Sequence, residues 1–103
     1  MVTVTFKFNE DKLNEIGKTV DDMLKPFREG FKEYDVQEIA TGVFQKDGKD
    51  GLVVLGVPLR YIRKNLRYIN LIDTWILDAD GEIEDCRQAT IEYYKKYKNL
   101  SVG

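Results

Sequence analysis

Val2-Thr3-Val4-Thr5-Phe6-Lys7-Phe8 alternates apolar and polar side chains over its whole length. Successive side chains of a β-strand point to opposite faces, so this period of two collects the apolar residues on one face. The stretch therefore predicts a strand that is buried on one face only.

The segment after this strand predicts a long amphipathic helix with an interruption. Asn9 is a good N-cap, and two acids follow it at the positive end of the helix dipole. Apolar residues then recur at spacings of three and four, namely Leu13, Ile16, Val20, Met23, Leu24, Phe27, Phe31 and Tyr34. Gly17 and Pro26 interrupt the stripe, and Pro inside a helix costs about 3 kcal/mol. We expect a kink or break between residues 17 and 26.

Three further strands are expected between residues 36 and 77. Residues 36–44 predict a second strand, and residues 46–51 contain two Asp-Gly pairs that suit a turn. Leu52-Val53-Val54-Leu55 is apolar on both faces, which predicts a central strand covered on both sides. Residues 71–77 predict another strand, which turns at residues 78–81.

One internal repeat follows residue 58. Leu59-Arg60-Tyr61-Ile62 returns as Leu66-Arg67-Tyr68-Ile69, with a period of seven. In a helix, seven residues make about two turns, so equivalent residues of the two copies lie on the same side. In a strand, a period of seven is odd, so equivalent residues would lie on opposite faces. Pro58 suits a first helical position. These features predict a helix over 58–69, and the alternative is a long hairpin that turns at Lys64-Asn65.

The last element predicted is a helix over residues 84–99. Its inner side is expected to consist of Cys86, Ala89, Thr90, Tyr93 and Tyr97. Lysines in its last turns suit the negative end of the helix dipole.

The resulting order is β-α-β-β-α-β-α. Its first six elements resemble the split βαβ arrangement of ferredoxin-like domains, in element order and not in any sequence motif. The expected fold is a single α+β domain over residues 1–103, a two-layer sandwich with a mostly antiparallel sheet and an added C-terminal helix.

Composition excludes several classes of function. The 103 residues allow one hydrophobic core, and a net charge of −2 gives no overall attraction to nucleic acid or anionic membrane. The absence of His and the single Cys exclude the common zinc sites, an internal disulfide and imidazole catalysis. No apolar run spans a membrane and the N-terminus lacks a signal-peptide pattern, so we expect a cytoplasmic protein.

Two motif-like stretches fail on their chemistry. Gly17-Lys18-Thr19 resembles the end of a phosphate-binding loop, but Lys12 stands where that loop needs another Gly. Residues 78–83 resemble the middle of a calcium loop, but Ile76 and Arg87 occupy the first and last ligand positions. We therefore expect no metal and no cofactor.

Isolated acids and the cysteine carry no clear catalytic pattern. The acid pairs Asp21-Asp22 and Glu84-Asp85 suit helix starts, where they complement the dipole. Asp73 is expected at a sheet edge, because burial of an unpaired carboxylate is costly. Cys86 is expected to pack in the core rather than to act as a nucleophile.

The feature most suggestive of binding is a basic face on the predicted helix 58–69. Its cations recur at i, i+3, i+4 and i+7, and two tyrosines flank them; the candidate residues are Arg60, Tyr61, Arg63, Lys64, Arg67 and Tyr68. Basic side chains interleaved with aromatics can hold phosphates and bases. The alternatives are a plainly solvated face, near the acids of residues 73–85, and a surface for an acidic protein partner.

These observations favour a small non-enzymatic interaction or regulatory domain. One alternative is a nucleic-acid-associated protein that uses the basic face, and another is an enzyme built from carboxylates and tyrosines. A homodimer is expected, because residues 52–55 and 71–77 are apolar on two faces. The long helix covers one face, and the other must be covered by a second subunit or, alternatively, by the last helix.

Overall fold

The computed structural model describes residues 1–97, which form a five-stranded antiparallel sheet and five helices. In chain order the elements are β1 (Val2–Phe8), α1 (Glu10–Glu15), α2 (Val20–Phe31), β2 (Gln37–Ala40), β3 (Val43–Lys46), α3 (Val53–Lys64), α4 (Tyr68–Leu71), β4 (Ile72–Ala79), β5 (Glu82–Asp85) and α5 (Cys86–Tyr97). The strands lie in the order β2-β3-β1-β4-β5, and each pairing is antiparallel. The predicted α+β class is confirmed.

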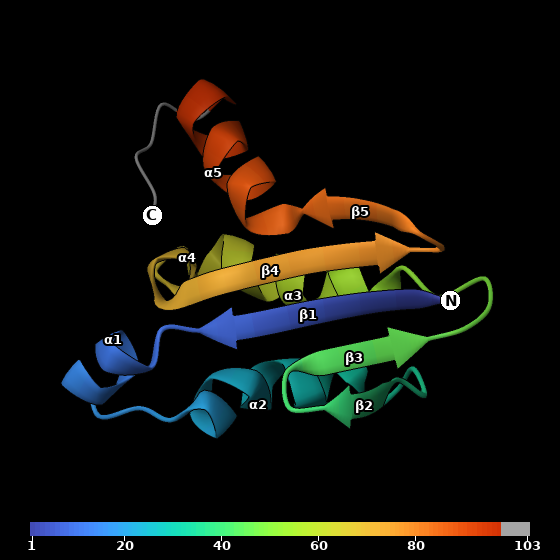
Figure 1. Cartoon of the computed structure of the whole chain (residues 1–103), viewed down its shortest axis with the longest axis horizontal. Helices are drawn as coiled ribbons and strands as arrows, with labels where there is room; N and C mark the ends of the chain where they lie inside the picture. Colours follow the sequence, from blue (N-terminus) through green and yellow to red (C-terminus); the bar gives the residue numbers. More distant parts are fainter. Residues whose placement is uncertain (98–103) are drawn as a thin grey trace.

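The sheet is covered on one face. In Figure 1, α2 and α3 lie behind the sheet, and none of the helices within residues 1–97 lies in front of it. The strand β1 is central, and its four apolar residues are buried against the helices while Thr3 and Thr5 are half-buried and Lys7 is exposed. The half-buried strand predicted from the alternation is confirmed, and its polar side belongs to the open face.

The predicted interruption of the first helix is confirmed at Gly17 and not at the proline. The side chain of Asn9 caps α1 by accepting from Lys12 N at 3.0 Å. Gly17 then takes a positive φ of 68°, and Thr19 starts α2 with a capping box. Pro26 lies inside α2 without ending it.

The strand predicted at residues 52–55 is wrong, because α3 begins there. The segment predicted as one strand over 36–44 is instead a tight hairpin of β2 and β3. Residues 52–55 start a helix whose buried side is Val54, Pro58 and Ile62, spaced four residues apart. A short apolar run fits a strand or a helix equally well, so only the continuation of its spacing distinguishes the two.

The repeat segment is helical and does not form a hairpin, but the predicted single helix over 58–69 is wrong in extent. Helix α3 ends at Lys64, and Asn65 leaves the helical conformation with φ −136° and ψ 67°. In the second copy of the repeat, Leu66 and Arg67 form a turn, whereas Tyr68 and Ile69 start the short helix α4, which leads directly into β4.

The strand β5 was not predicted. Its four residues are exposed and mostly acidic, so they show no apolar alternation. Asp80 and Gly81 both take positive φ and join β4 to β5 in a hairpin turn. Helix α5 therefore begins at Cys86, two residues later than expected, and its predicted residues 98–99 lie outside the described residues.

The helical layer packs tightly against itself and against the sheet. A Cβ on Gly30 of α2 would lie 2.5 Å from Val57 Cγ1, so α2 and α3 approach each other closely at this point. Beneath them Phe27 stacks on Phe6 with ring centroids 4.9 Å apart, and Trp75 is fully buried 5.7 Å from the Phe6 ring. These rings form the centre of the hydrophobic core.

Candidate functional site

The four cations of the predicted basic face are all exposed, and they divide between the two sides of α3. Arg60 and Lys64 border a groove between α2 and α3, together with the carboxylates of Glu29 and Glu33. Arg63 lies on the other side of α3. Lys64 also lines a second groove with Arg67, which lies beyond the end of α3 because the helix breaks at Asn65.

Each of these cations shares its groove with carboxylates without contacting one. Arg63 lines the same cavity as Glu84, and Arg67 the same groove as Asp22. Within residues 1–97 no ion pair involves Arg60, Arg63, Lys64 or Arg67. The surface is therefore of mixed charge rather than a concentrated basic patch.

Tyr61 and Tyr68 belong to the aromatic core. Their ring centroids are 5.0 Å apart, and both rings pack on Phe27, at 5.9 and 5.7 Å. The Tyr68 hydroxyl donates a hydrogen bond to the carbonyl of Met23 at 3.1 Å, and burial raises the pKa of Tyr68 well above its usual value. Both tyrosines are half-buried, so their rings contribute to packing rather than offering free surfaces for base stacking.

The structure confirms two of the predictions about single residues. Cys86 is buried, and burial raises the pKa of its thiol to about 11, so the thiol is protonated at neutral pH and is a poor nucleophile. Asp73 is exposed on the part of β4 that extends past its pairing with β5, and it accepts a hydrogen bond from Asn9 Nδ2 at 3.3 Å.

The strongest polar network was not predicted. Arg28 of α2 donates to both carboxylate oxygens of Glu38 on β2, at 2.7 and 2.9 Å, and to Asp21 at 3.0 Å. Glu38 also accepts from the backbone N–H of Gly42 at 3.1 Å. The network ties the β2–β3 hairpin to α2. The sequence contains no signal for it, because Arg28 and Glu38 lie on separate elements.

This network gives a pH-dependent stability. The hydrogen bonds from Arg28, and then that from Gly42, hold the pKa of Glu38 below its usual value. A carboxyl with a lowered pKa in the folded state stabilises the fold above its unfolded pKa, and this contribution is lost as the pH falls through the folded pKa. We expect Glu38→Gln to lower the free energy of unfolding by about 1–2 kcal/mol at pH 7. Between about pH 5 and 3, the free energy of unfolding of this variant should fall less steeply than that of the unmodified protein.

Urea unfolding of both proteins at several pH values measures this effect. Glu33→Gln, which changes an exposed carboxylate beyond the end of α2, serves as the control and should follow the unmodified protein. Equal acid sensitivity of Glu38→Gln and the unmodified protein would contradict the expected role of Glu38.

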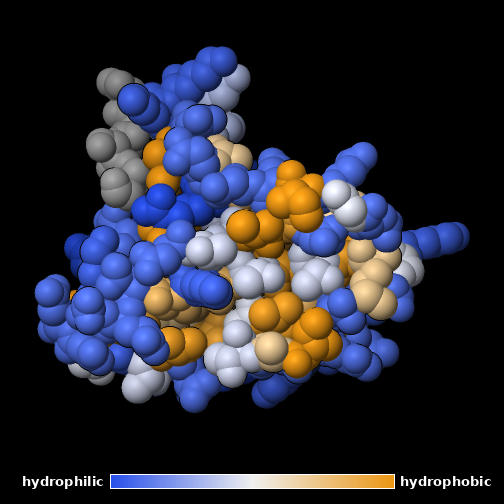
Figure 2. All heavy atoms as spheres, viewed as in Figure 1, coloured by the Kyte–Doolittle hydropathy of each residue, from blue (hydrophilic) through white to orange (hydrophobic). Residues whose placement is uncertain are grey.

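The open face of the sheet carries ordered rows of side chains. The strand register places Val43, Thr5, Ile76 and Asp85 in one row across β3, β1, β4 and β5. The next row contains Gln45, Thr3, Asp78 and Ile83. Figure 2 shows hydrophobic residues among the polar ones on this face, and Ile83 is 64% exposed.

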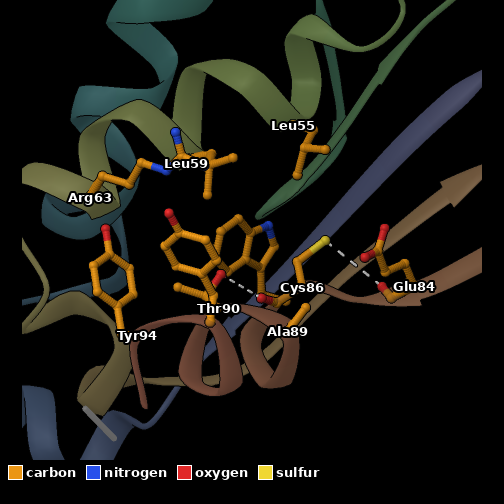
Figure 3. Close-up of a pocket in the computed structure, with 10 residues that line it drawn as sticks. Leu55, Leu59, Arg63, Glu84, Cys86, Ala89, Thr90 and Tyr94 are labelled. Atoms are coloured by element: carbon orange, nitrogen blue, oxygen red, sulfur yellow. Dashed lines mark hydrogen bonds between the residues drawn. The ribbon is translucent and has the colours of Figure 1, made fainter. Parts of the chain in front are cut away.

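A cavity of about 160 Å³ lies on the opposite, helical side of the molecule, between α3 and α5. Figure 3 shows Leu55 and Leu59 of α3 on one side and Cys86 and Thr90 of α5 on the other. The remaining lining residues are Arg63, Trp75, Glu84, Ala89, Tyr93 and Tyr94.

The polar groups of this cavity differ in how well they are satisfied. The Thr90 hydroxyl donates to the carbonyl of Cys86 at 2.7 Å. The indole Nε1 of Trp75 is buried, and no group within residues 1–97 accepts its proton. An unsatisfied buried donor costs about 1–3 kcal/mol, so this N–H is an exception that calls for a partner.

Comparison of the chain with protein-family models, with curated proteins and with solved structures finds no match. In the part of the chain that the structure describes, no three His, Cys, Asp or Glu side chains gather as metal ligands. None of the helices there has the length and apolar character needed to cross a membrane.

Proposed function

We propose that this chain is a small non-enzymatic interaction domain that associates with a second copy of itself through the open face of its sheet. The observation that carries the proposal is the asymmetry of the sheet. One face is covered by α2 and α3, whereas the other presents Val43, Ile76 and Ile83 with no element of residues 1–97 over them (Figures 1 and 2).

The charges on this face are arranged to complement a second copy. On β1, Lys7 lies two residues after Thr5 and Thr3 lies two residues before Thr5. Thr3 is paired with Asp78 on β4. A two-fold axis that lies between the two sheets and crosses the strands at Thr5 reverses the strand direction from one copy to the other. It therefore brings Lys7 of the first copy over Thr3 and Asp78 of the second, and Lys7 of the second copy over Thr3 and Asp78 of the first. Such a self-complementary contact is what an isologous dimer requires.

The apolar residues of the face suit the same geometry. Val43 and Ile76 flank Thr5 in the row on which the axis lies, so the two copies would bring these side chains together. Asp85 ends this row on the edge strand β5, so the same axis brings the two Asp85 carboxylates toward each other at the exposed rim, where water and salt screen their repulsion. Two sheets packed face to face in this way lie about 10 Å apart.

Sedimentation equilibrium at micromolar concentration tests the proposal, and we expect twice the mass of one chain. Ile76→Glu places a charge in the centre of the contact and should weaken the dimer by at least about 100-fold, because that charge would be desolvated. Lys7→Glu should weaken it by about tenfold through repulsion by Asp78.

Two further variants keep the test decisive. Leu52→Glu changes a residue that is 60% exposed at the start of α3, away from the open face, and should leave the dimer intact. Ile83→Lys changes an exposed edge residue, and it should weaken association even if Ile76→Glu is poorly folded by circular dichroism. A monomer at tens of micromolar, or a dimer unaffected by all three variants of the face, would overturn the proposal.

A second candidate is the binding of nucleic acid by Arg60, Arg63, Lys64 and Arg67. The exposure of all four cations favours it. The neighbouring carboxylates and the packing of Tyr61 and Tyr68 into the core make it weaker than self-association. Its distinguishing mark would be a binding affinity that falls steeply with salt concentration, with a log–log slope of about −0.9 per phosphate contact on duplex DNA.

A further inference from the structure

We propose that the cavity between α3 and α5 binds a small planar ring compound that carries a hydrogen-bond acceptor, which accepts from the indole N–H of Trp75. Two independent observations carry this inference. One is a cavity of about 160 Å³, and the other is a fully buried donor without an acceptor in residues 1–97, on one of the residues that line the cavity.

The size of the cavity suits a ligand of about one ring. An engineered cavity of about 150 Å³ in another protein, lined by aliphatic and aromatic side chains, binds benzene. The cavity here has nearly the same volume. A six-membered ring with one or two small substituents therefore fits.

The lining explains why the ligand must be a ring with an acceptor. Leu55, Leu59 and Ala89 supply apolar surface from two helices (Figure 3). The indole of Trp75 adds an aromatic wall. Such walls favour a flat apolar body. No polar group within residues 1–97 accepts the indole proton. The Thr90 hydroxyl and the Cys86 thiol instead donate to backbone carbonyls, those of Cys86 and Glu84.

The site is independent of the proposed dimer. Trp75 lies on the helical side of the sheet, because it pairs with Phe6, whose side chain is buried against the helices. The open face is on the other side (Figure 1). Binding should therefore be the same in the unmodified protein and in Ile76→Glu, provided that the variant is folded.

The chain's single tryptophan makes a direct experiment available, because its indole N–H gives one resolved signal in a ¹⁵N–¹H spectrum. The probes are acetophenone and α-methylstyrene, which have nearly the same shape but differ in that a C=O replaces a C=CH₂. We expect acetophenone to bind at about 0.1–1 mM, as for a ligand of nine heavy atoms. It should move the indole proton downfield and bind about three- to tenfold more tightly than α-methylstyrene.

Two variants separate the donor from the cavity. Trp75→Phe keeps an aromatic wall but removes the donor, so in ligand-observed titrations it should bind both probes with equal affinity. Ala89→Phe changes an exposed helix position that lines the cavity, and should abolish the binding of both probes by filling it. The second variant retains the tryptophan signal, and it remains informative if Trp75→Phe fails to fold.

Three results would overturn the inference. The first is no change in the indole signal at 5 mM acetophenone, which would mean that the donor is satisfied by water alone. The second is equal affinity of the unmodified protein for the two probes, and the third is undiminished binding by Ala89→Phe.

Discussion

Phe27→Ala should lower the free energy of unfolding by about 3–5 kcal/mol, the largest effect that we expect from the loss of a single side chain. Phe27 is fully buried in α2, and its ring contacts Phe6 of β1 at 4.9 Å between centroids. Tyr61 and Tyr68 pack on the same ring from the segments of α3 and α4. Removal of this side chain leaves a cavity at the junction of three helices and the sheet. The variant loses both the free energy gained by burying the ring and the van der Waals contacts of the ring with its neighbours.

Urea unfolding followed by circular dichroism measures the loss. A chain of this length has a total stability of about 5–15 kcal/mol, so the variant should be close to unfolding at 37 °C. Tyr97→Ala removes an aromatic ring that is 64% exposed, and should change stability by less than about 0.5 kcal/mol. A loss below about 1.5 kcal/mol in Phe27→Ala would contradict the central place given to this ring.

Gly42→Ala should cost about 2–4 kcal/mol, the second largest effect. Gly42 forms the β2–β3 turn with a φ of +79°, which is unfavourable for a residue with a Cβ. The added Cβ would also lie 2.7 Å from the backbone oxygen of Phe6, in the neighbouring strand. This oxygen cannot move away without distortion of the central strand, since Phe6 N donates to Gly42 O at 2.8 Å.

Gly48→Ala isolates the steric part of this effect. Gly48 also takes a positive φ, +92°, but a Cβ there would meet nothing within 4 Å. We expect a cost of only about 1–2 kcal/mol from the backbone conformation. Equal losses in the two variants, measured by urea unfolding, would show that the close approach of Gly42 to Phe6 has no effect.

The elements predicted correctly are those in which a local pattern extends over several turns or alternations. The alternation in residues 2–8 requires only that one sheet face be buried, which the helical layer provides. The break at Gly17 and the caps at Asn9 and Thr19 are local hydrogen-bonding events, so local sequence predicts them well. The burial of Cys86 follows from its place on the packed side of α5.

The errors occur where the same local pattern fits two structures. Leu52–Leu55 is apolar on both faces as a strand, but in α3 one side packs on the core and Leu52 remains 60% exposed. The strand β5 consists of exposed residues at a sheet edge, so backbone pairing with β4 forms it without any apolar pattern. The basic face was predicted on a continuous helix, and the turn at Asn65 redirects its second half.

Residue types and their local spacing were enough to predict the α+β class and the half-buried first strand, and to exclude metal sites that require histidine. Three other features emerged only once the chain was folded. Tyr61 and Tyr68 join the core, Arg28 and Glu38 connect α2 to β2, and Trp75 lines a cavity with its N–H unpaired within residues 1–97. These contacts join residues on separate elements, and their energies depend on which surfaces come together when distant parts of the chain pack.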